Sequence, residues 1–231
     1  MNRLFIRESQ GRLTSAAGNP IDKVNIAVTG LGQNVGTTFV ASSLAFYFAE
    51  KGNNLTFTQC LTPSRSNGLL YDAVAMDQRF HSRTFVDFYD LIKDGKPIKD
   101  KKNIESGINW RLPTPWDCEK KLDLDQEQKS RLIQGARSQI CVYDFEVEED
   151  WDKFLLDMDV ILVVVDPLPS KLIRHSGRFK QLKQMELAGA KVKWLVNRVN
   201  AGINRRQVSG YLKSNDLILI EEFPIEAVYA D

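Results

Sequence analysis

Three glycines and two threonines lie close together near the N-terminus, in the stretch GLGQNVGTT. The glycines are Gly30, Gly32 and Gly36, and Thr37 and Thr38 follow at once. Glycines let backbone N–H groups face an anion, and a threonine hydroxyl can be a ligand of Mg²⁺. These residue types at this spacing indicate a loop that binds phosphate groups.

The elements on either side would position that loop. An apolar run at 24–28 predicts a strand before it, and 39–51 predicts a helix after it. A helix N-terminus adds favourable potential for a phosphate. The usual triphosphate loop reads G-x-x-x-x-G-K-[ST]. With Gly36 aligned to its last glycine, Thr37 takes the place of the lysine and Thr38 that of the Mg²⁺-binding hydroxyl.

The same glycines resemble a dinucleotide-binding turn, which leaves a second interpretation open. That turn needs an acidic residue at the end of the second strand, where it holds the ribose. The second predicted strand ends Thr58-Gln59-Cys60, without an acid. The phosphate loop also gives the threonine pair a role and is favoured. A dinucleotide-binding enzyme, or a tight turn without a ligand, stays as an alternative.

Apolar runs and helical patterns alternate along the rest of the chain. Further strands are predicted at 55–60, 140–143, 160–165, 192–196 and 217–220, and helices at 126–136, 169–187 and 205–213. Strands that are apolar on both faces and alternate with helices predict an α/β fold. We expect a single, mainly parallel twisted sheet with helices on both faces.

The domain organisation follows from the composition of each segment. Residues 1–20 are expected to form an N-terminal arm, and 21–231 the phosphate-loop domain. Within that domain, 77–123 is rich in charged and aromatic residues and is predicted to be an irregular insertion. It is expected to contain a helix at 85–93 and a short strand near 108–112.

Composition limits the compartment and the partners. The chain has 31 Lys and Arg against 30 Asp and Glu, so net charge does not support a nucleic-acid partner, although a local basic patch remains open. Three cysteines without a C-x-x-C pair are typical of a reduced, cytoplasmic protein. No apolar run approaches the ~20 residues of a membrane span, and the first twenty residues lack a signal core.

Acidic and basic residues elsewhere suggest a metal site and two solvated faces. Asp144 ends the strand at 140–143, where ligands bind in open α/β sheets, and could hold Mg²⁺ with Thr38. The acids just beyond it are expected to be solvated: Glu146, Glu148, Glu149 and Asp150. Asp166 is expected in a turn. A solvated face is likewise expected for the basic residues of the helix at 169–187: Lys171, Arg174, Arg178, Lys180 and Lys183.

The segment VNIAVTGLGQNVGTTFVASSLAFYFAEKG resembles the start of MinD/ParA-type ATPases, the deviant Walker A branch of phosphate-loop proteins. The likeness extends over most of 24–229. Tyr143-Asp144 is similar to the family's Walker B-like strand end, and Asn197-Arg198 to the strand end that recognises adenine. The resemblance implies ATP or ADP with Mg²⁺ held by Thr38 and Asp144. The nucleotide-binding residues it implies are Gly30, Gly32, Gln33, Asn34, Val35, Gly36, Thr37, Thr38, Asn197, Arg198 and Pro224.

The departures from the family pattern concern charge. Gly32 stands where the family has a signature lysine, and Thr37 where other phosphate loops have theirs. Cys60 and Thr62 fall where the family has acids, one of which orients the attacking water. Phosphoryl transfer depends on positioning and charge stabilisation, so each loss is expected to cost on the order of 10²-fold or more in rate.

The resemblance with these losses implies a degenerate ATPase site that binds nucleotide weakly or not at all. We expect a scaffold, regulatory or positioning component of a cytoplasmic assembly, with a protein partner and a homodimer as expected associations. An active ATPase that uses Thr37, Thr38 and Asp144 is the alternative within the same family.

Overall fold

Eight strands form one sheet in the order β3-β4-β2-β5-β1-β6-β7-β8 in the computed structural model, which describes residues 23–63, 70–71, 74 and 84–222. Every neighbouring pair is parallel except β3–β4. The strands are β1 (Val24–Gly30), β2 (Leu55–Cys60), β3 (Ile104–Glu105), β4 (Ile108–Arg111), β5 (Ile140–Phe145), β6 (Val160–Val165), β7 (Val192–Val199) and β8 (Leu217–Glu221). The predicted mainly parallel α/β sheet is confirmed.

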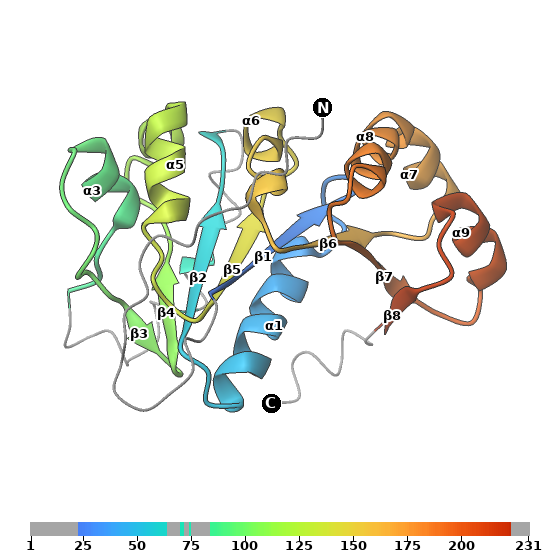
Figure 1. Cartoon of the computed structure of the whole chain (residues 1–231), viewed down its shortest axis with the longest axis horizontal. Helices are drawn as coiled ribbons and strands as arrows, with labels where there is room; N and C mark the ends of the chain where they lie inside the picture. Colours follow the sequence, from blue (N-terminus) through green and yellow to red (C-terminus); the bar gives the residue numbers. More distant parts are fainter. Residues whose placement is uncertain (1–22, 64–69, 72–73, 75–83, 223–231) are drawn as a thin grey trace, which may run out of the picture.

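Helices cover both faces of this sheet (Figure 1). The helix α1 (Thr37–Glu50) packs on one face. The opposite face is covered by α3 (Phe88–Lys93), α5 (Gln126–Gln134), α6 (Glu149–Asp152), α7 (Pro169–Arg174), α8 (Ser176–Leu187) and α9 (Arg205–Leu212). The structure also contains the short helix α4 (Cys118–Leu122) and a 3₁₀ turn, η3 (Leu155–Asp157). None of the described helices combines the length and the apolar content needed to cross a membrane.

Successive side chains of the central strands point to alternate faces of the sheet, and this alternation produces two core layers. Ile26 and Val28 of β1 pack in the cluster that contains α1, whereas Ala27 between them packs in the cluster on the other face. A strand covered on both faces is therefore mostly apolar, as in the run VILVVV of β6, although β2 also buries the polar residues Thr56, Thr58 and Gln59.

Two predicted helices have different bounds, each for a local reason. The helix predicted at 169–187 is broken at His175 into α7 and α8. The helix predicted at 85–93 begins only at Phe88, because Asp87 caps it by accepting hydrogen bonds from the backbone N–H groups of Tyr89 and Asp90.

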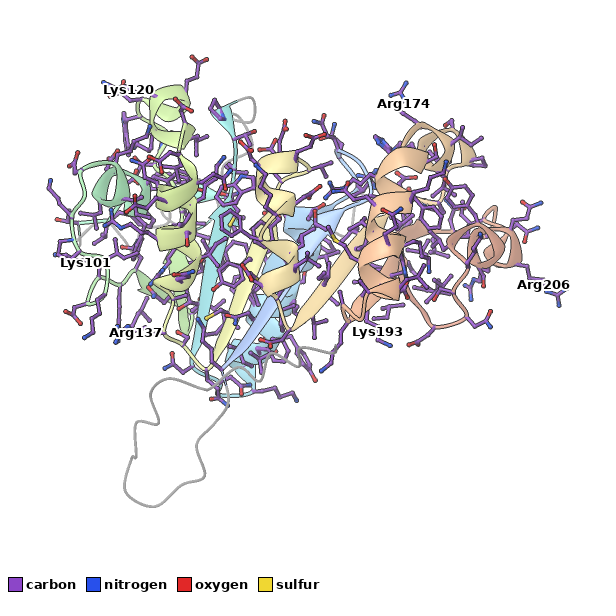
Figure 2. The ribbon with its side chains drawn as sticks, turned by 45° about the horizontal axis from the view of Figure 1, so that its top comes forward. Lys101, Lys120, Arg137, Arg174, Lys193 and Arg206 are labelled. Atoms are coloured by element: carbon purple, nitrogen blue, oxygen red, sulfur yellow. The ribbon has the colours of Figure 1, made fainter. Side chains whose placement is uncertain are left out.

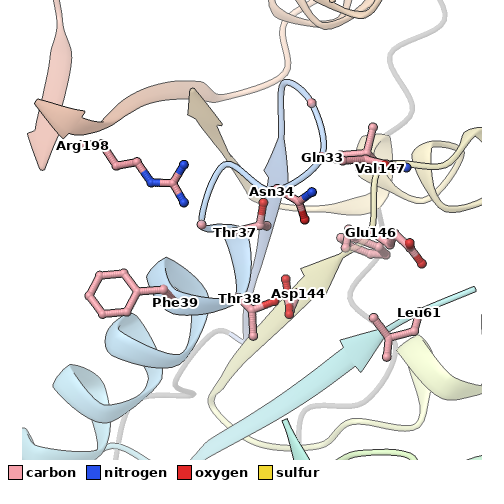
Figure 3. Close-up of a pocket in the computed structure, with 13 residues that line it drawn as sticks. Gln33, Asn34, Thr37, Thr38, Phe39, Leu61, Asp144, Glu146, Val147 and Arg198 are labelled. Carbon is pink, nitrogen blue, oxygen red and sulfur yellow. The ribbon is translucent and has the colours of Figure 1, made fainter. Parts of the chain in front are cut away.

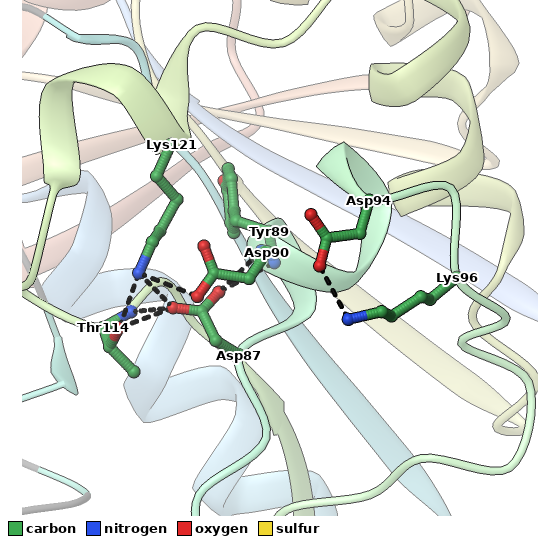
Figure 4. A network of polar contacts seen from close by, with 7 residues as sticks. All are labelled: Asp87, Tyr89, Asp90, Asp94, Lys96, Thr114 and Lys121. Carbon is green, nitrogen blue, oxygen red and sulfur yellow. Dashed lines mark hydrogen bonds and ion pairs between the residues drawn. The ribbon is translucent and has the colours of Figure 1, made fainter.

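The described part of the insertion extends the main sheet, since β4 pairs in parallel with β2. A buried polar network holds its helices together (Figure 4). The carboxylate of Asp87 accepts hydrogen bonds from the backbone N–H and hydroxyl of Thr114, at 2.8 and 2.6 Å, and from Lys121 Nζ at 2.6 Å. Asp87 caps α3 and Lys121 belongs to α4, so their ion pair joins the two helices. Removing either partner would leave an uncompensated buried charge.

Candidate phosphate-binding cleft

The glycine loop joins the end of β1 to the start of α1. Gly36 precedes the helix with φ 91°, a left-handed conformation that favours glycine. A Cβ on Gly36 would also lie 2.4 Å from the Asn197 side-chain nitrogen. That amide donates a 2.9 Å hydrogen bond to the Val35 carbonyl. Glycine is thus required here twice, by backbone conformation and by the close approach of β7.

A cleft of about 350 Å³ opens beside the loop, at the C-terminal ends of β1 and β5 (Figure 3). In the sheet, β1 lies between β5 and β6, while α1 carries the chain from β1 to β2 on the β5 side. Strand order therefore reverses at β1, and open α/β sheets bind ligands at such a point. The lining residues are Gly32, Gln33, Asn34, Gly36, Thr37, Thr38, Phe39, Leu61, Asp144, Phe145, Glu146, Val147 and Arg198.

Asp144 lies beside Thr38 because of its place in β5 (Figure 3). It has the same strand parity as Ile140 and Val142, which pack on the α1 side, and it pairs in register with Gln59 of β2. Burial raises the pKa of Asp144 to about 7, although hydrogen bonds from Thr38 and Gln59 lower it; the Glu146 carboxylate raises it further. Its Oδ2 is buried and has no hydrogen-bond partner within the described residues.

Glu146 is a second buried acid in this cleft, so the expectation that it is solvated is wrong. Its Oε2 accepts hydrogen bonds from the Thr62 backbone N–H, at 2.7 Å, and from the Thr62 hydroxyl, at 2.6 Å. Glu149 and Asp150 are exposed, as expected. Glu146 shares strand parity with Asp144, a sequence signal that could have placed it in the site.

Arg178 anchors the start of the loop, so it does not belong to a solvated basic face. Its guanidinium donates to the Gly30 carbonyl and to the Thr29 hydroxyl, both at 2.9 Å, and pairs with the buried Asp152. Of the other basic residues on α7 and α8, Lys171 pairs with Asp166 and Lys183 with Glu186. Arg174 and Lys180 are exposed.

Asp166 combines the expected turn position with a role in an ion-pair cluster. Its Oδ1 accepts from the Leu168 backbone N–H, and its buried Oδ2 lies 2.6 Å from Lys171 Nζ and 3.1 Å from an Arg198 guanidinium nitrogen. Arg198 adopts φ 59° directly after Asn197. This cluster therefore holds the one cationic side chain that lines the described part of the cleft.

His175 occupies the space next to Gly32. No pattern in the sequence predicts this contact between two distant segments. A Cβ built on Gly32 would lie 2.3 Å from His175 Nε2. Burial, together with the charges of Arg174 and Arg178, lowers the pKa of His175. The space that a longer side chain at position 32 would enter is thus filled by the junction of α7 and α8.

The structure brings most of the predicted site residues to the cleft and places three others behind or beside it. Gly30 and Val35 contribute carbonyls that are bonded to Arg178 and Asn197, and neither lines the cleft. The buried Asn197 side chain braces the loop. Pro224 lies outside the described residues. The nucleotide-binding roles of the whole set remain predictions.

Comparison with known proteins identifies the fold. No protein-family model and no curated protein matches the chain. Among solved structures, a ParA family ATPase from Chlorobium tepidum matches with TM-score 0.67 and 15% identity, over 90% of this chain and 87% of that one. The septum site-determining protein MinD of Pyrococcus horikoshii, complexed with Mg-ADP, matches with TM-score 0.65 and 16% identity, over 88% and 82%.

A third structure extends the same pattern. A putative plasmid partition protein of Borrelia burgdorferi, bound to AMPPNP, matches with TM-score 0.67 and 13% identity, over 87% of this chain and 86% of that one. The fold expected from the sequence resemblance is therefore confirmed: its structural neighbours are ParA and MinD ATPases.

Proposed function

We propose that this protein binds ATP or ADP with Mg²⁺ in the cleft, hydrolyses ATP weakly or not at all, and acts as a scaffold or positioning component of an assembly. One observation carries the proposal. Among the described residues that line the cleft, the sole cation is Arg198, which is tied to Asp166, while Asp144 and Glu146 supply two carboxylates.

Magnesium is central to this proposal because of that charge balance. The cleft retains the backbone loop and the Thr38 hydroxyl, and the buried Asp144 Oδ2 lacks a hydrogen-bond partner among the described residues. An unsatisfied buried carboxylate oxygen beside a hydroxyl fits a hard cation that takes only one or two protein ligands and completes its shell with water and phosphate. Thr38 and Asp144 would hold the ion, which would offset the phosphate charge.

Weak hydrolysis is expected because the described part of the cleft lacks, apart from Arg198, the cationic side chains that would stabilise the transition state of phosphoryl transfer. The charge that develops in phosphoryl transfer is normally countered by a loop lysine or an arginine in addition to the metal. Thr37 offers only a hydroxyl, and His175 fills the space beside Gly32. The nucleotide would therefore act chiefly as a bound effector.

The decisive experiment measures binding of ATP, ADP and NAD(P) by calorimetry, with and without Mg²⁺, alongside steady-state ATP turnover. We expect binding of the adenine di- and triphosphates only with Mg²⁺, no NAD(P) binding, and turnover near background. Thr38→Ala should abolish the Mg²⁺-dependent binding, whereas Ser43→Ala, a change at an exposed helix position, should leave it unaltered. NAD(P) binding in place of ATP would support the dinucleotide alternative, and absence of any binding would reject the proposal.

An active ATPase is the second candidate, and the position of Glu146 favours it. This acid lines the cleft and is bonded to Thr62, the residue that stands where the resemblance expects an acid. Glu146 would then orient the attacking water from β5. Turnover that is lost in Glu146→Gln and retained in Glu148→Gln would establish this candidate and reject the degenerate site.

The assembly role is the least direct part of the proposal. It is supported by the names of structures with a similar fold, which include a MinC:MinD cell division protein complex of Aquifex aeolicus (TM-score 0.62, 17% identity) and the putative plasmid partition protein. We propose a homodimer and a protein partner for this chain too. Light scattering with and without Mg-ATP tests the dimer: an unchanged monomer under saturating nucleotide would contradict it.

A further inference from the structure

A small polar pocket of about 100 Å³ lies at the opposite edge of the sheet from the cleft, at the N-terminal ends of β2, β4 and β5. Its cationic lining residues come from three parts of the chain: the segment before β3, the strand β4 and the turn before β5. They are Lys99, Lys101, Lys102, Arg111 and Arg137. Figure 2 shows Lys101 and Arg137 near the same end of the molecule, far from Arg174 and Arg206.

The charge of this pocket is not neutralised within the described structure. Lys99, Lys101, Lys102 and Arg137 are exposed, and none has an ion-pair partner among the described residues. Asp100 and Glu105 lie on the same segment, but neither lines the pocket. Like charges held close together without counter-ions are unfavourable unless an anion joins them.

Arg111 places a buried guanidinium in the lining of the same pocket. It is 2% exposed, and two of its guanidinium nitrogens donate to carbonyls at the end of α5, those of Leu132 at 3.1 Å and Gly135 at 2.7 Å. Its Nε has no partner within the described residues. The α5 C-terminus contributes roughly half a negative charge, too little to balance the four remaining cations.

Polar groups without charge complete the lining. The Thr56 and Ser138 hydroxyls are 2.6 Å apart, and Asn109 Nδ2 lies 3.4 Å from Thr56 Oγ1. Sites for whole drug-sized ligands usually enclose ≈ 300–1,000 Å³, so this pocket has room for one small group. Its size and its donors match a tetrahedral dianion, which lysine and arginine bind through charge-assisted hydrogen bonds.

We propose that this pocket is a second anion site, which binds a single phosphate group, either as free phosphate or as the headgroup of a phosphorylated lipid. The pocket and the cleft lie at opposite ends of the parallel strands, so we expect phosphate binding in the pocket not to require a nucleotide in the cleft. Lys101 and Arg137 provide exposed cations from two separate segments, and the buried Arg111 guanidinium adds a fixed positive charge to the lining.

The experiment titrates inorganic phosphate at low, constant ionic strength and follows backbone amide NMR signals of Gly107, Asn109 and Ser138. Signals of Gly36 and Thr38 report the cleft separately. We expect the pocket signals to shift in the wild type. The affinity should fall at least tenfold in the double variant Lys101→Glu/Arg137→Glu, since the charge-assisted hydrogen bonds of both cations are lost and the charges are reversed. Lys180→Glu, an exposed change on α8, should leave it unaltered.

Vesicle flotation then distinguishes the two sources. Binding to vesicles that contain phosphatidylinositol 4-phosphate, absent with phosphatidylcholine alone and lost in the double variant, identifies a lipid headgroup; no vesicle binding with an intact phosphate titration identifies free phosphate. The proposal is overturned if phosphate shifts only the cleft signals, if the double variant binds as the wild type does, or if duplex DNA but not phosphate shifts the pocket signals.

Discussion

Gly32 lies directly against the imidazole of His175, so that a Cβ at position 32 would be 2.3 Å from His175 Nε2. This contact joins the glycine loop to the junction of α7 and α8, two segments far apart in the sequence. It also gives a steric reason for the absence of a lysine at the position where the resemblance expects one.

The first prediction follows from that contact. Gly32→Lys should destabilise the protein by about 1–3 kcal/mol, because the imidazole must move out of its position. Adding His175→Ala should recover most of this loss, since it empties the occupied space. Urea unfolding of both single variants and the double variant measures the coupling. Additive effects would show that His175 does not restrict position 32.

Thr37→Lys tests the charge deficit of the loop. We expect tighter ATP binding, since a lysine there can contact phosphate oxygens as a point charge, and little gain in hydrolysis. Calorimetric titration and steady-state turnover read the two effects separately. Ser43→Lys on the exposed side of α1 adds the same charge away from the loop and should change neither. Unchanged affinity in folded Thr37→Lys would mean that a triphosphate is not held in the usual register.

The raised pKa of Asp144 predicts how stability depends on pH. Because its pKa in the folded protein is about 7, well above the ordinary value of 3.8, the stability that its protonated form contributes is present below pH 4 and is lost as pH rises through 7. Asp144→Asn should therefore be more stable than the wild type at pH 8, by on the order of 1–3 kcal/mol, and the difference should shrink toward pH 4. Denaturant unfolding at several pH values checks this, with the exposed Glu119→Gln as the control. A stability difference between Asp144→Asn and the wild type that grows toward acid pH would contradict the raised pKa of Asp144.

The same titration predicts the pH dependence of ligand binding. A metal ligand must lose its proton, so Mg-ADP should bind roughly tenfold more tightly at pH 8 than at pH 6 if Asp144 titrates near 7. Asp144→Asn should bind weakly and lose that component of the pH dependence, which separates it from the titration of the nucleotide. Equilibrium titrations at fixed free Mg²⁺ measure both proteins. Equal slopes in the two would place the metal elsewhere.

Arg178 is predicted to stabilise the fold and the loop at once. Arg178→Met leaves the buried Asp152 without its partner and should cost about 3–5 kcal/mol, whereas Lys180→Met on the same helix should stay within about 0.5 kcal/mol. Adding Asp152→Leu should restore much of the stability, because an apolar pair can replace a buried ion pair. In that folded double variant, Mg-ADP should bind less tightly, since the Gly30 carbonyl loses its anchor. Unchanged affinity would confine Arg178 to a structural role.

Local patterns in the sequence predicted the elements that form the site, and for a clear reason. A run of apolar residues such as 160–165 indicates a strand that is buried on both faces, and Gly36 indicates a backbone conformation that other residues avoid. The strands at 55–60 and 160–165 have the predicted bounds, and Thr38 and Asp144 both line the cleft, while their role toward a metal stays a prediction. These features depend on properties that a segment carries by itself.

Contacts between distant segments were decided only by the tertiary structure. Arg178 and Glu146 are of residue types that usually lie on a solvated surface. Arg178 nevertheless bonds to Gly30, 148 positions away, and Glu146 to Thr62, 84 positions away. The contact of His175 with Gly32 arises in the same way, and so does the grouping of cations around Arg111, whose exposed members have no ion-pair partner in the described part of the chain. A charged residue's type does not reveal which segment will cover it, because burial depends on the packing of the whole sheet. The sequence therefore determined the glycine loop and the strands beside it, whereas the tertiary structure determined which side chains surround that loop.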